Sequence, residues 1–208
     1  MSSKKRSHSS QMWLRRQQTD YYVQESKKRG LRSRAGIKLE ELQVKDRIFK
    51  PGMLVVDLGS APGGWSQVIR PWLGRHGRLI ALDILPMDPL AAVEFIQGDF
   101  SEDEVLAQLE SVVGDNTIDV VASDIAPNFT GIRGVDQARS MMLAELALAF
   151  ALEHLKPTGS FVVKGFQGEG YDDFVRTLKS EFKKVVCRKP QSSRSESREV
   201  YIVAKERR

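Results

Sequence analysis

The sequence has few of the residues that build disulfide frameworks or metal centres. Among its 208 residues there is one cysteine, Cys187, and there are three histidines. A single cysteine cannot form an internal disulfide, which is typical of proteins in a reducing compartment. The histidines show no ligand spacing, so we predict no metal site. We interpret Cys187, which follows two valines, as a core residue of a strand.

A long hydrophobic run is also absent. The longest apolar segment, 141–152, contains Glu145 and is too short to span a bilayer. The basic residues Lys4, Lys5 and Arg6 are followed by no apolar stretch, so no secretory signal is expected. Hydrophobic residues make up 41% of the chain and charged residues 28%, as in soluble globular proteins. We expect a cytoplasmic protein without membrane contact, and a monomer.

Charge is unevenly distributed along the chain. Residues 1–50 hold 14 lysines and arginines against 5 acidic residues, residues 51–160 hold 6 against 15, and residues 161–208 hold 12 against 7. The net charges of these segments are therefore +9, −9 and +5. Basic ends around an acidic middle indicate that a polyanion contacts both ends. A solvated basic surface is the alternative interpretation.

The chain is long enough for one ordinary domain, and no internal repeat or second domain is evident. We predict a single catalytic domain over residues 31–208, preceded by a partly disordered basic arm over residues 1–30. Within the arm, residues 1–12 are polar and serine-rich and are expected to be disordered. A first helix is expected over residues 13–28.

Short apolar strands alternate with helices after Pro51 and Gly52. Strands that are apolar on both faces imply a parallel sheet covered by helices on both sides. We therefore predict an α/β fold with a seven-stranded, mostly parallel sheet. The strands are expected over residues 54–56, 79–82, 93–96, 118–122, 161–163, 184–188 and 200–203.

Two helix starts are predicted from their capping residues. Ser33 is a candidate N-cap for a helix that reaches Ile48, and Val44 is one of its expected core residues. Ser101 and Glu104 have the spacing of a capping box, which predicts a helix beginning at that point.

The first strand runs into a glycine-rich turn with the sequence DLGSAPGGW, residues 57–65. Glycines without a Cβ let the backbone turn sharply and approach a ligand closely. The spacing of Gly59, Gly63 and Gly64 is GxxxGG, which differs from the GxGxxG that binds a dinucleotide pyrophosphate. Asp57, before the first glycine, favours a cationic ligand over a diphosphate.

Three further strands end at aspartates, namely Asp83, Asp99 and Asp124. Ligands of open α/β sheets bind beyond the carboxyl ends of the strands. Asp83 could accept hydrogen bonds from both hydroxyls of a ribose, and Asp99 could accept one from an exocyclic amine. One aspartate at such a position is more often a helix cap or a turn former. Four together indicate a binding site.

These motifs resemble a known family. The segments VVDLGSAPGGWSQ, GDF and SDIAPN, with Asp83, look like the S-adenosyl-L-methionine site of the Rossmann-like methyltransferases. Over nearly the whole chain, including GLRSRAGIKL, PGM, LPMDP, FVVKGFQGEG and SREVYIVA, the sequence resembles the FtsJ-type heat-shock methyltransferases. The resemblance implies S-adenosyl-L-methionine as cofactor, bound by Asp57, Gly59, Gly63, Gly64, Trp65, Asp83, Asp99 and Asp124.

The resemblance also implies a substrate. The FtsJ-type enzymes methylate a uridine ribose in the large-subunit (23S) ribosomal RNA, so we expect 2′-O-methylation of that RNA within the large ribosomal subunit, late in ribosome assembly. Lys38, Asp124, Lys164 and Glu199 match the Lys-Asp-Lys-Glu tetrad of ribose 2′-O-methyltransferases, which implies that they converge and that Lys164 accepts the proton. Judged singly, each would more often belong to a surface ion pair.

Other methyl acceptors fit the sequence less well. Carbon methylation of pyrimidines needs a nucleophilic cysteine, usually beside the proline that is Pro127 here, and Cys187 lies elsewhere. Methylation of base amino groups favours an aromatic residue after the prolines of an NPPY-like motif, and Asn128 stands there. An oxygen acceptor therefore fits this chain best.

Basic residues near the expected site could hold RNA phosphates, which supply most non-specific RNA affinity. They are Arg32, Arg34, Lys38, Arg194 and Arg198. Trp13, Tyr21 and Tyr22 could stack on bases, although core packing is the commoner role of helical aromatics.

Three alternatives remain open from the sequence. Transfer RNA could be the substrate of the same reaction. A nicotinamide-dependent oxidoreductase would use a similar fold, but the GxxxGG spacing and the paired lysines argue against it. A non-catalytic, RNA-binding ribosome-assembly factor could keep the fold without the reaction.

Overall fold

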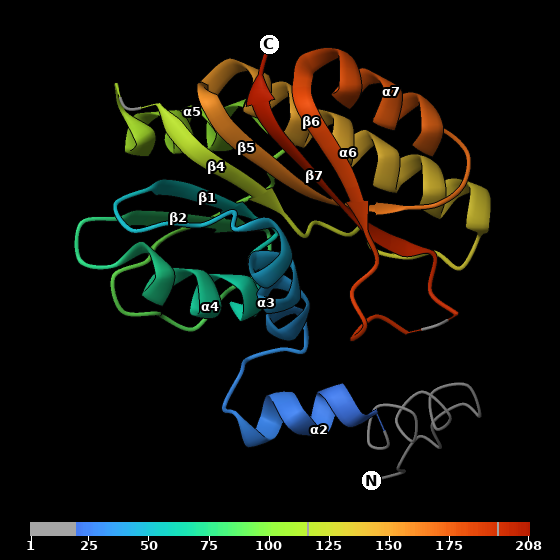
Figure 1. Cartoon of the computed structure of the whole chain (residues 1–208), viewed down its shortest axis with the longest axis horizontal. Coiled ribbons are helices and arrows are strands. Elements are labelled where there is room, and N and C mark those ends of the chain that lie inside the picture. Colours follow the sequence, from blue (N-terminus) through green and yellow to red (C-terminus); the bar gives the residue numbers. More distant parts are fainter. Residues whose placement is uncertain (1–19, 116, 195) are drawn as a thin grey trace, which may run out of the picture.

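The apolar segments form one seven-stranded sheet with helices around it (Figure 1). The computed structural model describes residues 20–115, 117–194 and 196–208. Its strands are β1 (Leu54–Leu58), β2 (Arg78–Asp83), β3 (Glu94–Gln97), β4 (Ile118–Ser123), β5 (Leu155–Phe166), β6 (Phe182–Arg188) and β7 (Glu199–Arg207). Their order is β3-β2-β1-β4-β5-β7-β6. Only β7 runs antiparallel to its neighbours, so the prediction of a mostly parallel sheet is confirmed.

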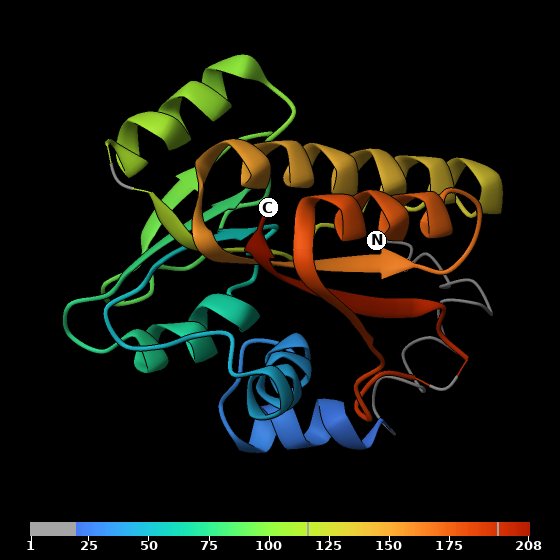
Figure 2. The same ribbon diagram turned by 45° about the horizontal axis from the view of Figure 1, so that its top comes forward.

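Helices cover both faces of the sheet (Figure 2). The helices are α2 (Tyr21–Lys28), α3 (Ala35–Asp46), α4 (Gly64–Leu73), α5 (Asp103–Val113), α6 (Arg133–His154) and α7 (Tyr171–Glu181). One core cluster packs α5, α6 and α7 against one face, and a second packs α3 and α4 against the other. Along β1, Val56 and Leu58 face the first cluster and Val55 faces the second. This alternation explains why all of β1 is buried.

Both predicted helix caps are wrong. Helix α3 begins at Ala35, and its N-cap, Arg34, makes no side-chain capping bond. Ser33 instead lies against Gly64, where a Cβ would strike the serine hydroxyl. The backbone N–H and hydroxyl of Ser101 donate to Asp99 at 2.9 and 2.6 Å, so Ser101 belongs to a turn and α5 begins at Asp103.

Two residues predicted to lie in the core are exposed. Val44 is 80% exposed on α3, because the apolar face of that helix is complete with Ile37, Leu39 and Leu42. Cys187 is exposed on β6, an edge strand that pairs only with β7. Its Sγ accepts a hydrogen bond from the Tyr171 hydroxyl at 3.2 Å.

The basic arm is described only in part. Residues 1–19, with Trp13 and the segment predicted to be disordered, lie outside the described residues. Helix α2 is joined to α3 by Arg29, which donates to both carboxylate oxygens of Glu40 at 2.8 and 2.5 Å. No helix in the described ranges is long and apolar enough to cross a membrane.

Asp119 links three strands through hydrogen bonds, at the end of the sheet opposite to the predicted site. It lies on β4 and accepts a hydrogen bond from the backbone N–H of Leu54, at the start of β1, at 2.8 Å. Its other oxygen accepts from Nζ of Lys156 on β5, also at 2.8 Å. The Asp119 side chain is only 18% exposed, so these bonds are partly shielded from water.

Asp119→Ala should therefore lower the free energy of unfolding by about 1–3 kcal/mol, because the N–H of Leu54 loses its acceptor. Urea unfolding followed by circular dichroism measures the change. Asp173→Ala is the control, because the side chains of the Asp173–Arg176 pair are about three-quarters exposed, and it should change stability by no more than about 0.5 kcal/mol. Equal midpoints for the two variants would contradict the role given to Asp119.

Candidate active site

The carboxyl ends of five parallel strands bring acidic and basic groups into one row. In the order β3, β2, β1, β4 and β5, these ends carry Asp99, Asp83, Asp57, Asp124 and Lys164. The pairing register aligns the ends, since Leu58 on β1 lies opposite both Leu82 and Ser123. The predicted cofactor aspartates are thus neighbours along a single edge of the sheet.

Backbone geometry explains the glycines of the turn after β1. Gly59 has φ 77°, and a Cβ on it would lie 2.7 Å from the Cα of Ile125. Gly63 has φ 101° and is the N-cap of α4, where a Cβ would lie 2.9 Å from the side chain of Arg32. Both positions therefore need glycine. Gly64 serves to pack α4 against Ser33.

Asp57 is the most deeply buried acid of this row. It is 0% exposed, and one carboxylate oxygen accepts a hydrogen bond from the Ser66 hydroxyl at 2.6 Å. Its other oxygen, Oδ1, has no partner among the described residues. Burial, together with the nearby charges of Asp124 and Asp83, raises the pKa of Asp57 to about 7.

Local hydrogen bonds orient the next two acids of the row. Asp83 accepts from the backbone N–H groups of Ala61 and Leu85, at 2.9 and 2.8 Å, and so fixes the turn after β1 to the turn after β2. Asp99 accepts both of its bonds from Ser101, through Oδ1. These hydrogen bonds lower the pKa of Asp99 and keep it ionised.

The edge fits the expected cofactor, S-adenosyl-L-methionine. The buried Oδ1 of Asp57 and the hydroxyl of Ser60 have no partner in the described part of the chain, so both can bind a ligand. Gly59 and Gly63 give the turn that carries Ser60 its backbone conformation, since both have positive φ values and both pack closely against the protein. A row of carboxylates also suits a ligand that carries an ammonium and a sulfonium group.

The four residues of the predicted tetrad come together from four elements. Nζ of Lys38, on α3, lies 2.5 Å from Oε1 of Glu199, on β7. Nζ of Lys164, on β5, lies 3.1 Å from Oδ1 of Asp124 and donates to its backbone oxygen at 2.5 Å. The side chains of Lys38 and Lys164 are 11% and 8% exposed. Two largely buried ion pairs thus lie at the end of the row of carboxylates.

Tyr201 joins the two pairs, and the sequence reasoning missed it. Its hydroxyl donates to Oδ1 of Asp124 at 3.3 Å and accepts from Nζ of Lys38 at 3.5 Å. Burial, with the charges of Asp124 and Glu199, raises the pKa of Tyr201 well above its ordinary value, so the phenol stays neutral and can donate. The available signal was its spacing from Glu199, because residues two apart on a strand share a face.

The charge of Glu199 is maintained despite burial. Burial alone would raise its pKa, but the neighbouring Lys38, through charge and hydrogen bond, and the charge of Lys164 lower it below the usual value. Ser193 also donates to Glu199, at 3.1 Å. Glu199 is therefore an anion that holds the ammonium group of Lys38 in place.

Trp65 packs against Tyr201, the residue that joins the two ion pairs of the tetrad. Its ring centroid lies 5.7 Å from that of Tyr201, and its indole N–H donates to the backbone oxygen of Ala35 at 3.1 Å. The side chain is only 2% exposed. The structure thus gives the Trp65 side chain a packing role between α3 and Tyr201, and its backbone belongs to the first turn of α4.

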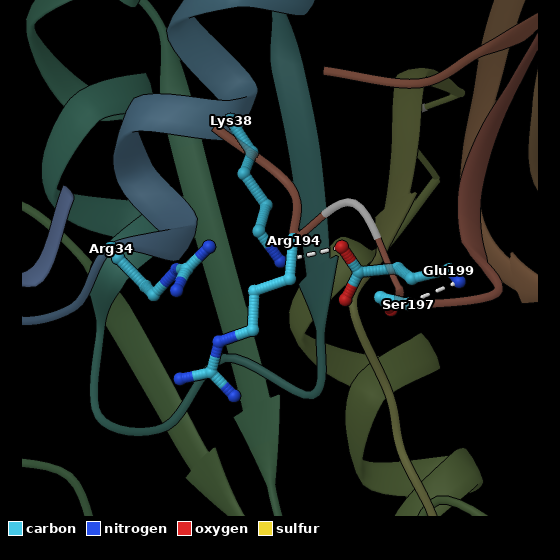
Figure 3. A pocket seen from close by; sticks show the side chains of 5 residues that line it. All are labelled: Arg34, Lys38, Arg194, Ser197 and Glu199. Atoms are coloured by element: carbon cyan, nitrogen blue, oxygen red, sulfur yellow. Dashed lines mark hydrogen bonds and ion pairs between the residues drawn. The ribbon is translucent and has the colours of Figure 1, made fainter. Parts of the chain in front are cut away.

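A pocket of about 240 Å³ opens beside the Lys38–Glu199 pair (Figure 3). Arg34 and Arg194 line it together with Ser197. Both arginines form ion pairs with Asp20, the N-cap of α2, and the Arg194 pair is 3.3 Å long. The pocket is therefore lined by cations from the two basic ends of the chain.

The other two predicted RNA-binding residues lie outside this pocket. The guanidinium of Arg32 donates to the backbone oxygens of Pro62, Asp88 and Pro89, at 3.2, 2.6 and 2.8 Å, and braces the glycine-rich turn. Arg198 donates to the backbone oxygen of Gln167 at 3.3 Å, on the loop after β5.

One group of possible metal ligands occurs away from this edge. Glu110, Glu153 and His154 offer ligand atoms that all lie within 4.8 Å of one another, on α5 and α6. Nε2 of His154 lies 3.2 Å from Glu110, so a histidine–carboxylate contact between the two helices accounts for the group.

Comparisons with known proteins agree with the geometry. Residues 31–207 match the family of FtsJ-like methyltransferases. A protein from Plasmodium falciparum, assigned as a ribosomal RNA methyltransferase, is 32% identical, with a TM-score of 0.76 over 85% of this chain and 98% of its own.

More distant structures share the fold alone. An assigned rRNA methylase from Clostridium thermocellum is 15% identical, with a TM-score of 0.55 over 81% of this chain and 97% of its own. A methyltransferase from Streptococcus mutans, solved with SAH, is 12% identical, with a TM-score of 0.50 over 77% and 90% of the two chains. The family match covers all of the predicted site, and the chain therefore belongs to the FtsJ-like methyltransferases, enzymes whose cofactor is S-adenosyl-L-methionine.

Proposed function

We propose that this enzyme methylates the 2′-oxygen of a uridine ribose in large-subunit ribosomal RNA, in the cytoplasm and late in ribosome assembly, and that it acts as a monomer. The observation that carries this proposal is the pair of buried lysines, each ion-paired to a carboxylate, at the end of the cofactor edge. Such a site offers groups that can bind a hydroxyl and remove its proton.

The order of the strand ends suggests how the cofactor lies. Asp99 and Asp83, on the outer strands, would receive the adenine amine and the ribose hydroxyls. Asp57 and Ser60 lie near the centre of the row, and their Oδ1 and hydroxyl have no partner among the described residues, so they would receive the amino acid end. The methyl group would then face Asp124 and Lys164, which end the next two strands.

When bound, the cofactor supplies an electrophilic methyl group on a sulfonium. Nζ of Lys164 would accept the proton of the ribose hydroxyl as the oxygen bonds to this methyl carbon and the carbon–sulfur bond breaks, with the thioether of the cofactor as the leaving group. Asp124 holds this nitrogen through its carboxylate and its backbone oxygen. Lys38 carries a fixed positive charge, held by Glu199, that stabilises the negative charge developing on the oxygen.

Ribosomal RNA is the favoured substrate because the Plasmodium falciparum protein, at 32% identity over most of both chains, is assigned to it. The arginine pocket beside Lys38 suits RNA phosphates. The same catalytic groups could also methylate a ribose of transfer RNA.

Mass mapping of ribose methylation in RNA from cells with and without the gene distinguishes ribosomal RNA from transfer RNA as the substrate. We expect one 2′-O-methyluridine to be lost from the large-subunit RNA. Loss of a modification from transfer RNA alone would overturn the substrate assignment.

The affinity for S-adenosyl-L-methionine should rise between about pH 6 and about pH 8. The pKa of Asp57 is about 7 without ligand, and only its ionised form attracts a cation. Affinity limited by this ionisation falls up to about tenfold per pH unit below the pKa. Titration calorimetry across this range tests the expectation. Asp57→Asn should bind more weakly and with little pH dependence in the same range, and a wild-type affinity independent of pH would refute the expectation.

Asp20→Asn should strengthen RNA binding by about three- to tenfold, on the scale of a single phosphate contact. The substitution releases Arg34 and Arg194 from a competing carboxylate, while asparagine can still cap α2. Filter binding over a salt series should also show a steeper log–log slope. Asp173→Asn, in an exposed ion pair on α7, is the control. Unchanged affinity and slope would mean that RNA does not use these arginines.

Lys164→Ala should reduce the single-turnover rate of methyl transfer by at least about a hundredfold, because the proton loses its acceptor. Lys164→Arg should not restore the rate, since a guanidinium stays protonated. Cofactor affinity should change little, because the acids on the other strands bind the cofactor. An arginine variant of nearly wild-type rate would show that Lys164 supplies only charge.

A further inference from the structure

An exposed aromatic ring lies in the segment after β4 that begins with Asp124, and no function is yet assigned to it. Phe129 is 60% exposed, in the segment that joins β4 to α6. Its ring meets that of Phe166, at the end of β5, with centroids 5.9 Å apart and planes at 87°. This edge-to-face contact leaves much of the Phe129 ring open to solvent.

Strand geometry places Phe166 on the catalytic face of the sheet. Phe166 and Lys164 are two residues apart on β5, so their side chains leave the same face about 6.6 Å apart along the strand. Across the β5–β7 pairing, Lys164 lies opposite Tyr201 and Phe166 lies opposite Glu199. The pair of rings, Phe129 and Phe166, therefore begins two residues beyond Lys164, at the end of the same strand.

Two successive residues at the start of α6 hold the loops that carry these rings. Asp136 accepts hydrogen bonds from the N–H and hydroxyl of Thr130, at 2.7 and 2.8 Å, and from the N–H of Gly131, at 3.0 Å. Nε2 of Gln137 donates to the backbone oxygens of Phe166 and Glu169, at 2.9 and 3.0 Å. Asp136 and Gln137 are both buried. Phe129 thus directly precedes a turn whose backbone Asp136 holds in place.

A cation accompanies the aromatic pair. Two hydrogen bonds join Arg198 to Gln167, the residue after Phe166. The guanidinium of Arg198 donates to the backbone oxygen of Gln167, and the backbone N–H of Gln167 donates to the backbone oxygen of Arg198 at 3.0 Å. Aromatic rings beside arginines, along a groove that binds phosphates, are the pattern used for single-stranded nucleic acids.

We propose that Phe129, backed by Phe166 and flanked by Arg198, is a stacking platform for an unstacked nucleobase at or next to the ribose that is methylated. The proposal rests on the proposed function, because it takes RNA as the substrate. A base is attached to the carbon beside the one that carries the 2′-oxygen, so a ribose at Lys164 brings a base to its immediate surroundings. The platform continues the tetrad surface, which favours a base over a protein side chain as its occupant.

The platform implies a substrate class. A base in a continuous helix has both faces covered by its neighbours, so only a base in a loop, bulge or single strand, or one turned out of the helix, can stack on Phe129. Stacking is tolerant of base identity, so this contact selects an accessible nucleotide, and the choice of uridine rests on other contacts.

The test compares two ligands that differ only in their bases, a short oligouridylate and the same ribose-phosphate chain without bases. Binding is measured with S-adenosylhomocysteine present, so that no turnover occurs. Phe129→Ala should weaken binding of the oligouridylate by about tenfold or more and leave binding of the abasic chain unchanged. The slope of affinity against salt should stay the same, because no phosphate contact is lost.

Two further variants complete the test. Phe129→Trp should keep the affinity for the oligouridylate, since it keeps an aromatic face. Val44→Ala, which removes another exposed apolar side chain, should match the wild type on both ligands. Equal loss on both ligands, or no loss on either, would overturn the proposal. Failure of methyl transfer or of the RNA mapping would instead overturn the proposed function, because this binding test needs neither.

Discussion

The register between β4, β5 and β7 is the constraint on which the site depends. Ser123 at the end of β4 pairs with Val163, which places Asp124 beside Lys164. Lys164 in turn pairs with Tyr201 on the antiparallel β7. A slip of one residue in either pairing would turn one side chain of each pair to the opposite face of the sheet. The buried apolar residues on both faces of these strands hold the register and, through it, the ion pairs.

Buried charge at this edge is stabilised by neighbours rather than by water. Each lysine of the tetrad is paired with a carboxylate, and Tyr201 supplies a neutral donor between the pairs. Removing one partner would leave an uncompensated buried charge, which is strongly destabilising. Asp57 is the exception, since burial and like charge raise its pKa. Its environment is unfavourable for an anion until a cation arrives, so the edge is arranged for a positively charged ligand.

Much of the fold could be predicted from the sequence because its signals are local. Runs such as residues 54–56 are apolar on both faces, which is typical of a covered parallel sheet. The glycine turn and the strand-end aspartates indicated the cofactor edge, and the resemblance indicated the tetrad. Tyr201 was missed because a tyrosine inside an apolar strand looks like ordinary core. Ser33 and Ser101 were misassigned because capping competes with other contacts of a serine, here the packing of Ser33 against Gly64 and the turn hydrogen bonds from Ser101 to Asp99.

The arrangement of α6 explains how reaction and recognition can share one edge. Its first turn holds the loop after β4 through Asp136 and the loop after β5 through Gln137. These two strands are also the ones that present Asp124 and Lys164. A single helix end thus fixes the loops that extend from the catalytic strands. The framework that positions Lys164 would therefore also position a base stacked on Phe129. Binding of the base would then align the 2′-hydroxyl of its ribose with Lys164.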